Sequence, residues 1–126
     1  MTKPANSLFQ PILVFDTTSR DQTSVALVID DKIEKRIAPV RAQDLQVLAD
    51  QQLKSAKIVP QDIKQIAVLV GPGSYTGTRM GVAAANTLGW LLDKPIVELD
   101  GDSLERALYQ LTRTSPKIVK KATVRY

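Results

Sequence analysis

The chain has 126 residues, the length of one domain and enough to bury a core. Hydrophobic residues make up 44% and charged residues 24%, as in ordinary soluble proteins, and the net charge is +4. The sequence contains no cysteine and no histidine, which excludes a structural zinc site and removes the commonest general base, so we expect no metal site. No apolar run is long enough for a membrane span and no signal peptide precedes Ile12, so we expect a cytoplasmic protein without membrane contact.

The first third of the chain predicts a three-stranded antiparallel meander. Apolar strands are expected over residues 12–15 and 24–29, separated by the turn-forming stretch DTTSRDQT. A second tight turn over residues 30–32 leads into a third strand, which we expect over residues 33–40.

The rest of the chain predicts alternating helices and strands. Apolar residues at helical spacing predict a helix over 41–56. Further helices are expected over 76–92 and 103–111, the last with Asp102 as its N-cap, and strands over 66–70 and 95–99. The order β-β-β-α-β-α-β-α predicts an α/β fold, a single ribonuclease H-like (actin, sugar kinase and Hsp70 type) domain with a mixed five-stranded sheet.

Positive charge is concentrated near the C-terminus. Residues 1–105 carry 11 Lys and Arg against 13 Asp and Glu, whereas residues 106–126 carry six Lys and Arg and no acid. We expect an N-terminal extension over 1–11, the domain over 12–111 and a basic tail over 112–126, with one more edge strand as the alternative for the tail. The tail is either a contact for a polyanion such as tRNA or a solvated terminus. The residues that would contact tRNA are Lys117, Lys120, Lys121 and Arg125.

A glycine-rich loop follows the strand expected over 66–70. It lacks the lysine of a P-loop, and Gly77 comes one residue too late for a dinucleotide-binding motif. An anion site at the following helix N-terminus, with Ser74 or Thr76 as cap, is one interpretation. A tight turn that needs glycine for its backbone geometry is the favoured one. The loop consists of Gly71, Pro72, Gly73, Ser74, Tyr75, Thr76 and Gly77.

The helix expected over 76–92 has two sides, neither of them strongly polar. One side gathers Gly77, Gly81, Ala84, Ala85, Leu88 and Leu91, and the other gathers Arg79, Val82, Ala83, Asn86 and Trp90. We therefore expect one side to cover the sheet and the other to contact a second helix. Glycine is unfavourable inside a helix, so Gly81 and Gly89 indicate close approach, by a partner chain in preference to the chain's own first helix.

Asp16 ends the first strand, where a ribonuclease H-like nuclease places one of its metal-binding carboxylates. The other clustered carboxylates that such an enzyme needs are missing. Asp16, Thr17 and Thr18 also resemble the phosphate-binding hairpin of sugar kinases and are the candidates for a nucleotide or anion site. Since no second domain is present to complete a nucleotide pocket, we expect Asp16 to form local hydrogen bonds.

The runs "ILVFDTTSRDQTSVALV" and "GPGSYTGTRMG" resemble the TsaB/YeaZ family, in register, within a similarity over about residues 12–104. This resemblance implies a non-catalytic scaffold subunit of the bacterial tRNA threonylcarbamoyladenosine complex. It implies pairing with TsaD, which transfers the threonylcarbamoyl group to the adenosine beside the anticodon, and the participation of TsaE, an ATPase. Family members carry a second domain, so the resemblance implies a short form or a fragment, with no ATP or ADP at the interdomain site.

The resemblance places the partner interface on the two helices expected over 41–56 and 76–92. The candidate interface residues are Asp44, Val47, Gln51, Arg79, Val82, Ala83, Asn86 and Trp90. Two alternatives are a minimal domain that binds and hydrolyses ATP and a homodimer built on the same helices.

Overall fold

The computed structural model describes residues 10–30, 32–39, 44–101, 103–113 and 117–123. The predictions for residues 1–9, Asp102 and Arg125 therefore lie outside the described residues. The elements are β1 (Ile12–Asp16), β2 (Thr23–Ile29), β3 (Lys32–Ala38), α1 (Leu45–Ser55), the 3-10 helix η3 (Pro60–Asp62), β4 (Gln65–Leu69), α2 (Tyr75–Leu92), β5 (Ile96–Leu99), α3 (Leu104–Arg113) and β6 (Lys117–Val119).

The strands form one mixed sheet in the order β3-β2-β1-β4-β5-β6. β1, β2 and β3 pair antiparallel, and β1, β4 and β5 pair parallel. This confirms the predicted α/β class with a mixed sheet.

The predicted number of five strands is wrong, because β6 pairs antiparallel with β5. Ile96 lies opposite Val119, and Glu98 lies opposite Lys117. Of the two alternatives for the C-terminal tail, the structure therefore shows the additional edge strand over residues 117–119.

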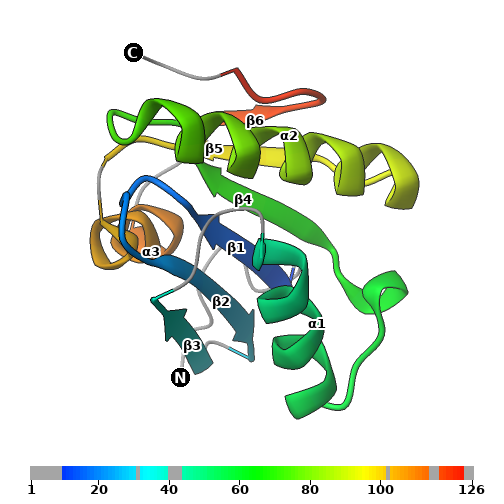
Figure 1. Cartoon of the computed structure of the whole chain (residues 1–126). Coiled ribbons are helices and arrows are strands. Elements are labelled where there is room, and N and C mark those ends of the chain that lie inside the picture. The colour runs from blue at the N-terminus through cyan, green and yellow to red at the C-terminus, as the bar shows by residue number, and fades with distance from the viewer. Residues whose placement is uncertain (1–9, 31, 40–43, 102, 114–116, 124–126) are drawn as a thin grey trace.

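Helices cover both faces of the sheet, with α1 and α2 on one face and α3 on the other (Figure 1). Successive residues of a strand point to opposite faces, and β1 is buried along its whole length. Leu13 and Phe15 belong to the core under α1 and α2, whereas Ile12 and Val14 belong to the core under α3. The chain thus has two apolar cores separated by the sheet.

Serine hydroxyls cap two of the helices. Ser74 Oγ accepts the N–H of Gly77 at 3.4 Å, so Ser74, and not Thr76, caps α2. Ser103 Oγ accepts the N–H of Arg106 at 3.3 Å at the start of α3. Among the described residues, no helix has the length and apolar character needed to cross a membrane.

Candidate functional site

The turn after β1 is held by its own side chains. The Asp16 carboxylate is buried, and its Oδ1 accepts the backbone N–H of Thr18 at 2.9 Å and the Thr18 hydroxyl at 2.5 Å. These bonds are local, as expected for Asp16. The Thr17 hydroxyl donates to the carbonyl of Gly77 at 2.6 Å, so both threonine hydroxyls of the turn donate within the chain.

The glycine loop packs directly against this turn. The N–H of Ser74 donates to the carbonyl of Thr18 at 2.7 Å. A Cβ at Gly73 would collide with Thr18, and a Cβ at Gly77 or Gly81 would collide with Thr17. These three glycines therefore allow the loop and the first turns of α2 to approach the β1–β2 turn.

This contact corrects the prediction that the glycines of the helix admit a partner chain. Gly81 faces Thr17, and a Cβ at Gly89 would collide with Ile96 of β5. Both glycines serve packing within the chain, Gly81 against the β1–β2 turn and Gly89 against β5. The atoms nearest to a Cβ at either glycine do not belong to the first helix, which was the alternative neighbour.

Gly71 has a backbone angle that only glycine adopts without strain. Its φ is 119°, and it forms an isolated bridge with Gly101, whose φ is 128°. The N–H of Gly101 donates to the carbonyl of Gly71 at 3.0 Å. This geometry and the packing of the loop favour the tight-turn interpretation over the anion site. In the part of the chain that the structure describes, no group of three or more His, Cys, Asp or Glu side chains could hold a metal ion.

A groove of about 720 Å³ separates α1 from α2. Leu13 and Phe15 of β1 lie at its floor, Val47 lines the α1 side, and Ala83 and Leu91 line the α2 side. The exposed fraction is 57% for Val47 and 65% for Leu91. The groove is thus an apolar surface that the described part of the chain leaves open.

The groove contains two of the eight predicted interface residues, Val47 and Ala83. Asp44, Gln51, Arg79 and Trp90 do not line it, although Trp90 is 81% exposed. Val82 is buried in the core below α2, so its predicted place on an open helix face is wrong.

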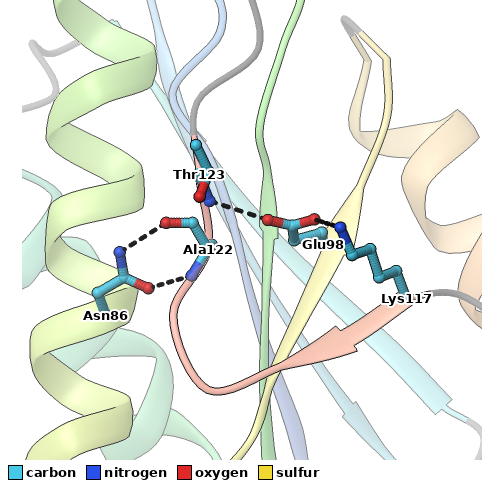
Figure 2. Close-up of polar contacts among 5 residues, drawn as sticks. All are labelled: Asn86, Glu98, Lys117, Ala122 and Thr123. Atoms are coloured by element: carbon cyan, nitrogen blue, oxygen red, sulfur yellow. Dashed lines mark hydrogen bonds and ion pairs between the residues drawn. The ribbon is translucent and has the colours of Figure 1, made fainter.

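Asn86 is already occupied by the chain itself, which corrects its predicted place on an open face. Its side-chain amide donates to the carbonyl of Ala122 at 2.9 Å and accepts the N–H of Ala122 at 2.6 Å (Figure 2). Asn86 therefore fixes the segment after β6 against α2.

Both corrections have one physical reason, which is that α2 is oriented about its axis differently from the prediction. The side of α2 that faces the sheet lies between the two predicted sides, and it carries Thr78, Val82, Ala85 and Gly89. The predicted interface residues do not include Leu53, Thr87 and Leu91, which line the groove. The spacing of Gly81, Ala85 and Gly89 at four residues was the signal that could have identified the sheet side, because the smallest side chains lie where the backbone comes closest.

Glu98 of β5 completes the attachment of the C-terminal segment. Its carboxylate is buried, accepts the N–H of Thr123 at 2.8 Å and lies 3.5 Å from the Lys117 ammonium (Figure 2). Lys117, Lys120 and Lys121, which are proposed to contact tRNA, are all exposed, and Lys117 is also engaged in this ion pair.

Comparison with known proteins places this architecture in a family. Residues 38–116, more than half of the chain, match the family model described as TsaD: tRNA N6-adenosine threonylcarbamoyltransferase. A 44-residue stretch is 54% identical to the tRNA threonylcarbamoyladenosine biosynthesis protein TsaB of Bacillus subtilis, covering 35% of this chain and 19% of that protein. A 48-residue stretch is 44% identical to the tRNA N6-adenosine threonylcarbamoyltransferase of Staphylococcus epidermidis, covering 38% of this chain and 14% of that protein.

The fold is similar to that of YeaZ from Pseudomonas aeruginosa, with a TM-score of 0.66 and 25% identity. The similarity covers 71% of this chain and 43% of YeaZ, so the chain spans less than half the length of the proteins it matches. The chain therefore belongs to the family that the TsaD model describes, among its TsaB/YeaZ-type members.

Proposed function

We propose that the chain is a non-catalytic scaffold subunit of the bacterial complex that makes threonylcarbamoyladenosine in tRNA, beside the anticodon. The observation that carries this proposal is the open apolar groove between α1 and α2. The proposed occupant is a helical surface of a TsaD-like catalytic subunit.

The chemistry of the groove suits a protein partner. Val47 and Leu91 project large apolar side chains that stay exposed, and Leu13 and Phe15 form an apolar floor. Among the described residues that line the groove, Asp50 is the one charged residue. An amphipathic helix that lies in such a groove buries its own apolar side together with these residues.

The proposal leaves the transfer reaction to the partner. The sequence has no histidine or cysteine, and the hydroxyls of Thr17 and Thr18 donate within the chain. A TsaE-like ATPase and the tRNA would join through the complex, in the cytoplasm, and the chain itself would need no cofactor. The proposal retains the ribonuclease H-like, actin-type fold predicted from the order of the elements.

Co-elution with a TsaD-like subunit tests the groove. Ala83→Arg and Thr87→Arg each place a long charged side chain on the α2 wall and are expected to abolish co-elution in size-exclusion chromatography while the melting temperature stays unchanged. Ser55→Arg is the matched control, because Ser55 is exposed at the end of α1 and does not line the groove. Wild-type co-elution by both groove variants would contradict the proposal.

Light scattering of the chain alone tests the homodimer alternative. We expect a monomer, which gains mass only when the TsaD-like subunit is added. A dimer that Ala83→Arg dissociates would instead assign the groove to self-association.

A further inference from the structure

The sheet register brings three lysines from distant parts of the sequence to one end of the sheet. Ile66 of β4 pairs with Ile96 of β5, and Ile96 pairs with Val119 of β6. Lys64 and Lys94 each lie two residues before the paired isoleucine, and Lys121 lies two residues after Val119. Since β4 and β5 are parallel and β6 is antiparallel to them, all three lysines lie at the same end of three adjacent strands, which are spaced about 4.8 Å apart.

These lysines present their charge to solvent. Lys64 and Lys121 are exposed, Lys94 is half-buried, and the neighbouring Lys120 is exposed as well. Within the described ranges, none of their ammonium groups forms an ion pair, whereas Lys117 is paired with Glu98. We call Lys64, Lys94, Lys120 and Lys121 the lysine row.

An exposed aromatic residue stands at the same end of the molecule. Trp90 is in the last turn of α2, four residues before Lys94, and its side chain is 81% exposed. The hydrogen bonds of Asn86 with Ala122 hold the turn that carries Lys120 and Lys121 beside α2 (Figure 2). The C-terminal end of α2, the start of β5 and the turn after β6 lie together in Figure 1.

In the part of the chain that the structure describes, two acidic residues lie within two residues of a member of this row. Asp62 precedes Lys64 and accepts the N–H of Val59 at 3.0 Å with its Oδ2 atom, and Asp93 precedes Lys94 with a φ of 54°. They are outnumbered by the four lysines, so the end of the sheet retains a positive charge.

We infer that the lysine row and Trp90 form a binding surface for an RNA strand. The lysines would contact successive phosphates, and the exposed indole would stack on an unpaired base. The choice of RNA over another polyanion rests on the proposed function, because the family of this chain acts on tRNA. Trp90 and the lysine row do not line the groove. We therefore expect one chain to engage the partner and the RNA at the same time.

Binding of a fluorescently labelled, unmodified tRNA transcript to the full chain, measured by anisotropy at several KCl concentrations, tests the inference. The Lys94→Glu/Lys121→Glu double variant is expected to weaken binding at least tenfold and to lower the slope of log K against log salt by about 2, one for each lysine. Arg20→Glu/Arg106→Glu is the charge-matched control, because both arginines are exposed and lie elsewhere, in the β1–β2 turn and on α3. It is expected to change the affinity less than twofold.

Trp90→Ala separates stacking from charge. It is expected to weaken binding about fivefold or more and to leave the salt slope unchanged, because a stacked base adds affinity without neutralising a phosphate. Asn86→Ala should weaken binding as well, because it releases the turn that carries Lys120 and Lys121.

Three results would overturn the inference. The wild-type chain could fail to bind the transcript at 50 mM KCl, or the control pair could lose as much affinity as the lysine pair. The lysine row could also be needed for binding to phosphatidylserine vesicles and not to tRNA, which would assign it to a membrane surface. Ala83→Arg is expected to bind tRNA like wild type, so failure of the groove proposal and failure of this inference give different results.

Discussion

At the scale of single residues, Thr17 organises the glycine loop. Its hydroxyl donates to the carbonyl of Gly77, and its side chain occupies the space beside Gly81. A glycine inside a helix costs about 1 kcal/mol relative to alanine, and here the cost is offset by packing of the helix backbone against this side chain. The same residue thus acts through a hydrogen bond and through its volume.

Gly81→Ala is predicted to destabilise the chain by about 1–3 kcal/mol, because the new Cβ would overlap the Thr17 side chain. Urea unfolding measures the change. Addition of Thr17→Ala should recover part of the loss, which a double-mutant cycle detects as coupling. Stabilisation of about 1 kcal/mol by Gly81→Ala, as helix propensity alone predicts, would show that the contact is unimportant.

Asn86→Ala is predicted to cost about 1–3 kcal/mol, because it removes both hydrogen-bond partners of the buried Ala122 backbone. Hydrogen exchange is the more specific measurement, since the N–H of Ala122 should lose its protection while the core strands keep theirs. Thr87→Ala, one residue along α2 and exposed, serves as the control. Unchanged protection at Ala122 would contradict the assignment.

At the scale of elements, α3 is the one described helix on its face of the sheet. Leu104, Leu108 and Leu111 pack there against residues of the central strands, including Val14 and Leu69. The opposite face is shared by two helices that leave a groove between them. Stability therefore depends strongly on α3, whereas the surface proposed for binding lies on the other side.

Leu108→Ala is predicted to lower the free energy of unfolding by about 2–5 kcal/mol, because it leaves a cavity in the core under α3. Val47→Ala is the contrasting variant, since Val47 is largely exposed in the groove and its truncation should change stability by less than about 0.5 kcal/mol. Denaturant titration compares the two. Equal effects would mean that Val47 is part of the core.

The spacing of apolar residues along the sequence was sufficient to predict most helices and strands, with errors of a few residues at their ends. The sequence does not decide whether Lys117–Val119 is a strand, because three residues followed by two lysines carry too little apolar pattern. Its position is decided by pairing with β5 and by Glu98, which are long-range contacts. The faces of α2 were misplaced because a helix with a single charged residue has no polar stripe to orient it.

At the scale of the whole molecule, two sequence observations argue against a nucleotide site: the predicted local role of Asp16, and the absence of a P-loop lysine from the glycine loop. The polar groups of the turn and the loop bind one another. The groove could not be located from sequence, since its floor comes from β1 and its walls come from two helices that are separated by 19 residues of the chain. Only the fold brings these surfaces together.

We therefore predict that the isolated chain shows no thermal shift with millimolar Mg-ATP. A ligand that binds the folded state at one hundred times its Kd stabilises it by about 2.7 kcal/mol, which a melting curve detects easily. A reproducible rise in melting temperature that Asp16→Ala abolishes would instead support the nucleotide-binding alternative.

The edge position of β6 has a consequence for synthesis of the chain on the ribosome. β5 is buried along its length, yet the edge of β5 that faces away from β4 is paired only once residues 117–119 have been made. Until then, β5 exposes unpaired backbone groups beside the apolar residues Ile96, Val97 and Leu99, a template for pairing with other chains. Nascent or truncated chains that end before Lys117 should therefore aggregate more readily than the whole chain and depend more on chaperones.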